Sequence, residues 1–311
     1  MRGSHSRVLA GTLAYLLASV FWGLNIPLTS ELLKHFDPFW VSPARYLIAS
    51  TLLAVWLLVA QGPAALRSPI PLVRIGLLSL LVSSFLVLFT LGLYLANPIT
   101  AAAVIAGSPV YVAIVSRLWT GAALERGFWG ATALTILGAG IAIYGRAAAA
   151  TTAGSQGLGL RGGELLIVLA IACWTVYSVL AQRWFTAEVS QLRRTFLSSL
   201  GAIPWLLLFW GLARGAGLVG PPNIHPTPDA LANLAISAVF CTALATVCWN
   251  IGMSRLGIST GALWQNMVPV FGVLISLTLY GVIPTVQQVV GGLVVLTGVL
   301  YMQWHRLRAP E

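Results

Sequence analysis

Residues 256–304 read LGISTGALWQNMVPVFGVLISLTLYGVIPTVQQVVGGLVVLTGVLYMQW and contain no Asp, Glu, Lys or Arg. About 20 helical residues cross a hydrocarbon layer of about 30 Å, because an α-helix rises about 1.5 Å per residue. The stretch is therefore long enough for two crossings. Proline disfavours helix in the residue before it, so the segment from Gly281 to Pro284 predicts a turn between the two. This part of the chain is predicted to be a transmembrane helical hairpin.

Charge-free blocks of the same kind recur along the whole chain. They cover residues 8–30, 46–66, 75–116, 127–145, 165–182, 195–213 and 230–254. Block 75–116 is again of double length and is interrupted by Asn97-Pro98, so the blocks predict ten spans. Only 8% of the residues are charged, against roughly a quarter in soluble domains, and 58% are apolar. The predicted fold class is all-α, a polytopic membrane protein with ten transmembrane helices.

The positions of the basic residues explain the net charge of +10. If the N-terminus is cytoplasmic, twelve basic residues fall on the inner side and five on the outer side. The inner group is Arg2, Arg7, Arg67, Arg74, Arg117, Arg126, Arg183, Arg193, Arg194, Arg255, Arg306 and Arg308. The outer group is Lys34, Arg45, Arg146, Arg161 and Arg214. The positive-inside rule then predicts an inner-membrane protein with both termini in the cytoplasm, and no nucleic-acid partner is needed to account for the charge.

Residues 146–162 are rich in Ala, Gly, Ser and Thr and are predicted to form an extracytoplasmic connector. They separate a first five-helix repeat, residues 1–145, from a second, residues 163–311. Because five is odd, two copies of one unit enter the membrane from opposite sides, as in the inverted repeats of many secondary transporters. Residues 92–138 align without a gap on residues 252–298, with eight identities. These are Gly92/Gly252, Thr100/Thr260, Ala102/Ala262, Pro109/Pro269, Val110/Val270, Ser116/Ser276, Gly121/Gly281 and Gly138/Gly298.

The first span carries polar and aromatic residues on a single helical face. Tyr15, Ser19, Trp22, Asn25 and Thr29 follow one another at steps of three or four residues. Polar groups at membrane depth face other helices or a water-filled path. Trp22 and Asn25 are therefore predicted to contact substrate. The alternative is a small polar interface that holds two helices together.

Two prolines near the middle of the fourth and ninth spans predict broken helices. Pro109 and Pro269 each leave the carbonyl four residues earlier, on Ile105 and Gln265, without its usual donor. Broken helices place free backbone dipoles at the bilayer midplane, where transporters bind substrate. The alternative is a kink that serves packing alone. Gln265 and Asn266 favour the first interpretation, because two amides in the apolar layer need polar surroundings.

The third, sixth and eighth spans also place aromatic or amide side chains on one face. Each alone is more often explained by helix packing, whereas together they predict a cavity walled by aromatic rings. The predicted substrate-binding residues are Trp22, Asn25, Phe85, Phe89, Tyr111, Trp174, Tyr177, Trp249, Asn250, Gln265 and Asn266. Tryptophans near the span ends are assigned to the interfacial aromatic belt instead: Trp40, Trp119, Trp129, Trp184 and Trp304.

Three segments resemble the EamA-type permeases of the drug/metabolite transporter superfamily. They are Trp22-Gly23-Leu24-Asn25, Pro109-Val110-Tyr111 and GAALERGFWGATALTILG at residues 121–138. The second half has Ile283-Pro284 where an acidic turn like that at Leu124-Glu125-Arg126 would stand. The resemblance covers nearly the whole chain and implies export or exchange of small metabolites. Within the superfamily the chain looks most like the aromatic and neutral amino-acid exporters.

The residues absent from the spans narrow the expected substrate. No Asp, Glu, Lys or His lies at mid-membrane depth. Phosphate-bearing substrates would need a fixed cation in the cavity, and hydrophobic cations would need a carboxylate. A neutral substrate with an apolar or aromatic body remains, such as a zwitterionic amino acid. The missing titratable groups also predict an uncoupled facilitator, with no proton coupling. Sodium coupling is left open, because the carbonyls freed by Pro109 and Pro269 can bind a sodium ion without a charged residue.

Other classes of function are less well supported by the sequence. Export of uncharged drugs or other metabolites is the alternative within transport. A membrane-embedded enzyme needs general acids, bases or metal ligands, and the four histidines and seven carboxylates show no ligand spacing. No catalytic residue, metal site or cofactor is predicted, and the oligomeric state is left open, a monomer being compatible.

Overall fold

The structure, a computed structural model, describes residues 2–95, 104–121, 124, 127–151, 162–217, 227–281 and 283–308. The predicted break at Asn97-Pro98, most of the predicted connector and residues 125 and 126 of the acidic turn lie outside this part. The helices are α1 (Arg2–Leu32), α2 (Pro38–Gln61), η1 (Pro63–Leu66), α3 (Leu72–Leu95), α5 (Ser108–Thr120), α6 (Phe128–Thr151), α7 (Gly163–Trp184), α8 (Gln191–Gly215), α9 (Pro228–Ile236), η2 (Ser237–Leu244), α10 (Ala245–Leu256), α11 (Ile258–Gln265), α12 (Met267–Tyr280) and α13 (Val286–Arg308).

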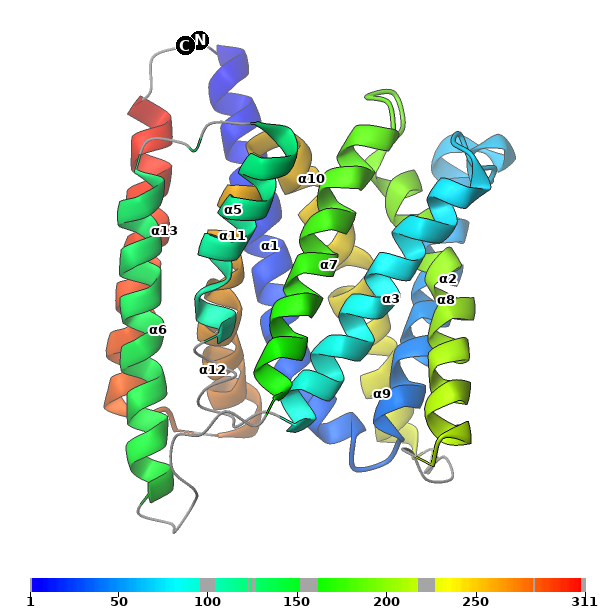
Figure 1. Cartoon of the computed structure of the whole chain (residues 1–311). Helices are drawn as coiled ribbons and strands as arrows, with labels where there is room; N and C mark the ends of the chain where they lie inside the picture. Colours follow the sequence, from blue (N-terminus) through cyan, green and yellow to red (C-terminus); the bar gives the residue numbers. More distant parts are fainter. Residues whose placement is uncertain are drawn as a thin grey trace.

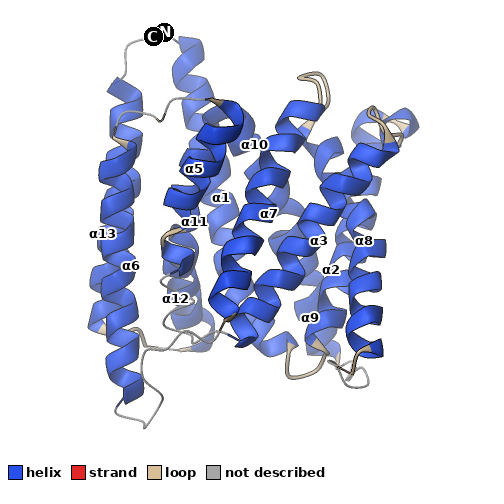
Figure 2. Ribbon diagram, viewed as in Figure 1, coloured by secondary structure: helices blue, strands red, loops and turns tan. Residues whose placement is uncertain are grey.

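The described part of the chain is a bundle of membrane-length helices with no strand (Figure 2). Eight helical stretches among the described residues are long and apolar enough to cross a membrane. Two shorter apolar helices, Ser108–Leu118 and Phe128–Tyr144, supply the other two crossings. The first residues of α1 and the last residues of α13 lie at the same end of the bundle (Figure 1), as an even number of crossings requires. The predicted all-α polytopic fold is confirmed.

Local sequence sets where several helices begin and end. Asp37 caps α2, with its Oδ1 accepting from the backbone N–H groups of Phe39 at 2.9 Å and Trp40 at 3.1 Å, and Pro38 opens the helix. Gly121 and Gly281 end α5 and α12, both with a φ of +66°, a left-handed conformation that glycine adopts without strain. The predicted turn after Gly281 is confirmed.

Three spans are not continuous α-helices. The fourth has helix at residues 104–106, a turn at Gly107, and then α5. The ninth breaks at Asn266, between α11 and α12. The breaks lie two residues before Pro109 and three residues before Pro269, so the predicted interruptions of both spans are observed. The eighth span also changes geometry, since η2 is a π-helix between α9 and α10.

Corresponding helices of the two halves make reciprocal contacts. Helix α1 packs on α10, and α7 packs on α3. At the first crossing a Cβ on Gly252 would lie 2.6 Å from the ring of Tyr15. At the second, a Cβ on Gly92 would lie 2.7 Å from the side chain of Ile167. Tyr15 precedes Trp22 by seven residues, as Ile167 precedes Trp174, so Tyr15 and Ile167 are matching positions of the two halves. Their contact partners, Gly252 and Gly92, are also an aligned pair.

Helices α6 and α13 form one edge of the bundle and cross closely (Figure 1). A Cβ on Gly138 would lie 2.5 Å from the carbonyl oxygen of Gly291. A Cβ on Gly298 would lie 2.9 Å from the carbonyl oxygen of Ala131. The alignment of the two halves pairs Gly138 with Gly298 and Ala131 with Gly291. Each half therefore makes the same close contact with the other, and this crossing is also reciprocal. Such contacts are expected of two copies related by a two-fold axis.

The outside of the bundle is aliphatic and its inside carries hydroxyl groups. Val59, Leu72 and Leu118 are among the most exposed large side chains. Between α3 and α8, by contrast, buried Ser79 donates to the carbonyl oxygen of Ser198, and buried Ser83 donates to that of Ala202. Small residues and interhelical hydrogen bonds of this kind associate helices in lipid, where the hydrophobic effect cannot.

Candidate substrate site

Seven aromatic side chains from α1, α3, α7 and α10 meet inside the bundle. This aromatic cluster consists of Tyr15, Trp22, Phe85, Phe89, Trp174, Tyr177 and Trp249. Six of them are among the residues that the sequence predicts to bind substrate. The seventh, Tyr15, shares the helical face of Trp22 but is not in that set. The structure therefore brings together predicted residues that lie far apart in the chain.

Trp174 is at the centre of the aromatic cluster. Its ring centroid lies 5.9 Å from that of Trp22, 5.1 Å from Phe85, 5.3 Å from Tyr177 and 5.8 Å from Trp249. These separations lie in the range at which aromatic pairs attract one another. Trp22 and Trp174 occupy matching positions in the first and sixth spans, so the two halves of the chain meet at these rings.

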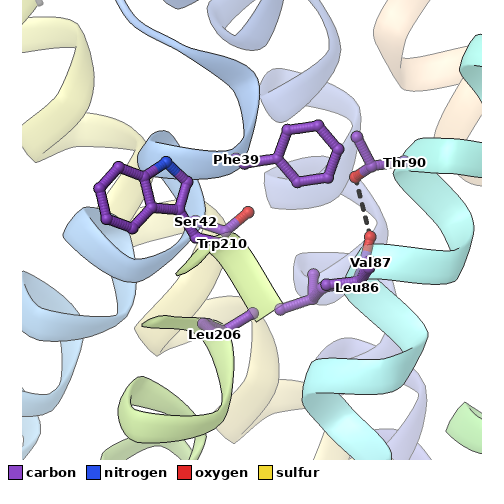
Figure 3. Close-up of a pocket in the computed structure, with 7 residues that line it drawn as sticks. All are labelled: Phe39, Ser42, Leu86, Val87, Thr90, Leu206 and Trp210. Atoms are coloured by element: carbon purple, nitrogen blue, oxygen red, sulfur yellow. Dashed lines mark hydrogen bonds between the residues drawn. The ribbon is translucent and has the colours of Figure 1, made fainter. Parts of the chain in front are cut away.

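Four side chains of the aromatic cluster are buried in this conformation, and Trp22, Phe85 and Phe89 are partly buried. Tyr15, Tyr177 and Trp249 are at most 1% exposed, and Trp174 is 7% exposed. A hollow of about 10 Å³ lies between α2, α3 and α8, lined by residues that include Phe39, Thr90 and Trp210 (Figure 3). That volume is about one water molecule. A larger hollow of about 300 Å³ faces outward between α2 and α8. Neither hollow contains a residue of the aromatic cluster.

Two indole N–H groups in this region have no hydrogen-bond partner. They are the Nε1 atoms of Trp174 and of Trp264, which lies on α11, and both atoms are buried. Trp249 Nε1, in contrast, donates to Ser178 Oγ across 3.4 Å. An unsatisfied buried donor costs about 1–3 kcal/mol, so such groups usually serve a purpose. A ligand with acceptor oxygens would satisfy them. Trp264 is not among the residues predicted from the sequence.

Two of the predicted amides already bond to neighbouring helices. Asn250 is 1% exposed, and its Nδ2 donates to Thr195 Oγ1 at 2.9 Å. Asn266 is 6% exposed, and its Nδ2 donates to the carbonyl oxygen of Ala106 at 3.3 Å. Gln265, beside it, is partly buried. Asn250 and Asn266 thus have structural partners in this conformation.

The hydrogen bond from Asn266 joins the two broken spans at their breaks. Ala106 directly precedes the turn at Gly107, so the carbonyl that receives the donor is next to the predicted Ile105. The side chain of Tyr111 folds back over the same turn. Its hydroxyl oxygen would lie 2.9 Å from a Cβ added to Gly107. Just before the ninth span's break, Ser19 Oγ donates to the carbonyl oxygen of Trp264 at 2.9 Å. Side chains from other spans therefore contact the backbone beside both breaks.

Asn25 belongs to a polar network that the sequence did not reveal. Its Oδ1 accepts from Thr29 Oγ1 at 3.2 Å and from Ser237 Oγ at 3.0 Å. Ser237 opens the π-helix η2, and its carbonyl oxygen accepts from Thr242 Oγ1 at 3.2 Å. Thr242 in turn accepts from Arg45. The network joins α1, η2 and α2.

Arg45 was predicted to lie on the outer side of the membrane, but it lies within the second membrane-spanning helix. The charge-free block begins at residue 46, whereas α2 begins at Pro38. Arg45 is therefore two turns inside a membrane-spanning helix and is partly buried. The signal for an earlier start is the Asp37-Pro38 pair, which is a typical helix N-terminus.

A ten-span bundle with discontinuous helices and polar groups at membrane depth is the architecture of a membrane transporter. The chain belongs to the EamA-like transporter family, whose model matches residues 9–144 and again residues 161–304. The expected resemblance is thus confirmed at the level of the family.

Two relatives and one solved structure resemble the whole chain. The uncharacterized transporter YyaM of Bacillus subtilis (strain 168) is 26% identical over 289 residues, covering 91% of this chain and 90% of the relative. The uncharacterized transporter YrdR of the same organism is 25% identical over 305 residues, covering 94% and 91%. A solved structure described as "Crystal structure of protein" aligns with a TM-score of 0.76 at 20% identity, covering 96% of this chain and 99% of that one. The last likeness concerns the fold alone.

Proposed function

We propose that this transporter exports small neutral metabolites, namely aromatic and other neutral amino acids, by alternating access. The substrate passes between two inverted five-helix repeats, residues 1–145 and 163–311, joined by an extracytoplasmic connector at 146–162. The protein lies in the inner membrane with both termini in the cytoplasm. It works as an uncoupled facilitator.

The observation that carries the proposal is the aromatic cluster together with the free N–H groups beside it. Four spans, two from each half, contribute its rings. Aromatic faces suit the apolar body of a substrate, and the unpartnered Nε1 atoms of Trp174 and Trp264 suit its acceptor oxygens. A neutral amino acid has both features.

Alternating access is supported by the reciprocal crossings and by the buried centre of the aromatic cluster. Each half contributes one span that is broken ahead of a proline, and Asn266 ties one break to the other. A transporter built from inverted repeats reaches its two states by exchanging the conformations of the halves. Opening the aromatic cluster to either side then requires the halves to move apart at α1 and α7.

Uncoupled transport is supported by where the described carboxylates lie. Glu31, Asp37, Glu164 and Asp229 are at helix ends, and Glu188 is in the turn between α7 and α8. Proton coupling by the usual route needs a titratable group at membrane depth that changes its protonation between the two states. The described carboxylates and histidines lie only at the ends of the spans or in the loops between them.

Uptake into liposomes that contain the purified protein tests the proposed substrate class. Labelled phenylalanine, leucine, glutamate and lysine are compared at equal concentration. The first two are expected to enter at least about tenfold faster than the charged pair, because an ionised side chain must leave water to enter an aromatic cavity. Protein-free liposomes are the control. Faster entry of glutamate or lysine, or uptake of none of the four, would overturn the substrate assignment.

The proposed topology predicts opposite labelling of two introduced cysteines. One replaces Thr152 in the connector, and one replaces Arg308 at the end of α13. In intact cells an impermeant maleimide should label only the first, because the positive-inside rule places the connector outside and the C-terminus inside. The native Cys173, Cys241 and Cys248 lie within spans and are replaced by alanine. Labelling at both positions, or at Arg308→Cys alone, would reverse or refute the topology.

A further inference from the structure

Arg45 carries a positive charge inside the membrane-spanning part of α2. It follows Pro38 by seven residues, so its backbone lies roughly 10 Å along the helix from the first residue. Charged residues at such depth are rare and costly, and they usually pair with another group or mark a substrate path. The partners of Arg45 therefore decide what the charge is for.

The guanidinium of Arg45 holds a hydroxyl where a carboxylate would fit. Its Nε and one terminal nitrogen, Nη2, both donate to Thr242 Oγ1, at 3.2 Å and 3.0 Å. These two N–H groups form the fork that binds both oxygens of a carboxylate in parallel. Here one neutral oxygen accepts from both prongs. The Thr242 hydroxyl uses its own hydrogen on the carbonyl oxygen of Ser237.

The described part of the protein provides no carboxylate for this fork. The ion pair between Lys34 and Glu31, at 2.7 Å, lies at the C-terminal end of α1 and does not involve Arg45. Asp37, the acidic residue nearest in sequence, uses its Oδ1 to cap α2. A hydroxyl dipole compensates a buried cation less well than an anion does. Among the described residues, therefore, no carboxylate neutralises this charge.

A chain of hydrogen bonds links the fork to the face of α1 that carries part of the aromatic cluster. The hydrogen-bonded chain from Arg45 runs through Thr242 and Ser237 to Asn25. Asn25 follows Trp22 by three residues, so the two lie on one face of α1, about 4.5 Å apart along the helix axis. The π-helix η2 contributes to this arrangement, because Thr242 bonds the carbonyl five residues before it.

We propose that Arg45 binds the carboxylate of the transported substrate, displacing the Thr242 hydroxyl from the fork, while the aromatic cluster holds the substrate's apolar body. The inference rests on the proposed transport of neutral amino acids and adds a requirement to it. A substrate must bear a carboxylate, and an equally hydrophobic amine or amide is discriminated against. The carboxylate points towards the end of the bundle where α2 begins.

Three indole compounds separate a carboxylate site from a purely aromatic one. They are L-tryptophan, L-tryptophanamide and 3-indolepropionate, which share one ring system and differ in the charged groups. Their affinities for the purified full-length protein are measured by ligand-induced shift of its unfolding temperature. The wild-type protein should bind L-tryptophan roughly tenfold or more tightly than L-tryptophanamide, as expected of charge-assisted hydrogen bonds. In Arg45→Gln this ratio should fall to about one.

Two further variants separate recognition from structural support. Arg214→Gln, in the last turn of α8, removes a cation that lies over Trp210 and should leave the ratio unchanged. Thr242→Val removes the hydroxyl that occupies the fork and keeps Arg45. Thr242→Val should bind L-tryptophan in preference to L-tryptophanamide at least as strongly as the wild-type protein does. This variant keeps the inference testable if Arg45→Gln does not fold.

Each outcome has a distinct consequence. If the wild-type protein binds L-tryptophan and its amide equally, or if Arg45→Gln weakens both by the same factor, Arg45 is structural and the inference fails while amino-acid transport stands. If only 3-indolepropionate binds, the carboxylate site stands and the proposed amino-acid substrate fails. If none of the three binds, both proposals fail.

Discussion

Replacing Trp174 by alanine should lower transport of L-phenylalanine by roughly tenfold or more per folded protein. The indole contacts four other aromatic rings. An aromatic pair contributes about 0.5–1.5 kcal/mol beyond burial, and about 1.4 kcal/mol corresponds to a factor of ten. The same change also removes one of the unpartnered N–H groups offered to the substrate. Both losses act at the site where the two halves meet.

Initial uptake rates in liposomes, divided by the amount of monodisperse protein, give the measurement. Trp129→Ala is the matched control, since Trp129 lies at the start of α6 with 57% of its surface exposed. Trp174→Phe keeps a ring and loses only the N–H group, so it should fall between the two. Transport by Trp174→Ala at the rate of Trp129→Ala would remove the aromatic cluster from the substrate path.

Gly138→Ala should destabilise the protein strongly, although it adds a single methyl group. The new Cβ would lie 2.5 Å from the carbonyl oxygen of Gly291 and 2.7 Å from the backbone nitrogen of Val295. Both are backbone atoms of α13 and cannot rotate away, so α6 and α13 must separate. Overpacking of this kind costs about 1–3 kcal/mol, which corresponds to a fall of several degrees in unfolding temperature.

The control for this substitution lies on the same helix. A Cβ on Gly140 would have no atom of the described neighbouring residues within 4 Å, and Gly140 is exposed on the surface of α6. Gly140→Ala should therefore leave the unfolding temperature unchanged or raise it slightly, because alanine is the better helix former. Thermal unfolding of the two variants in one detergent compares them directly. Equal unfolding temperatures would show that α6 and α13 do not cross as closely as described.

The spans and the aromatic residues could be predicted because their signals are local. Runs of apolar residues of membrane length define helices in lipid whatever their neighbours are. The faces that carry Trp22, Trp174 and Trp249 follow from helical periodicity, and residues on the inner faces of several spans must meet in a bundle. Pro109 and Pro269 marked the broken spans for the same reason, since each acts on its own backbone.

The features that were missed depend on partners from distant parts of the chain. The π-helix η2 has no signature in Ser237 to Leu244, and the role of Arg45 depends on Thr242, which lies nearly two hundred residues away. The partner of Asn266 is another such feature, since its Nδ2 donates to the carbonyl oxygen of Ala106, and contact of Asn266 with substrate stays a prediction. Periodicity shows which way a side chain points along its own helix, but not which group faces it.

Counterflow of L-phenylalanine tests the central claim, that the chain is an alternating-access carrier of neutral amino acids. Liposomes with the protein are loaded with unlabelled L-phenylalanine and diluted into tracer, with no ion gradient across the membrane. A carrier that returns bound to substrate exchanges one molecule for another, so tracer should accumulate transiently above its outside concentration. Tracer that never exceeds the level of unloaded or protein-free liposomes would contradict the account.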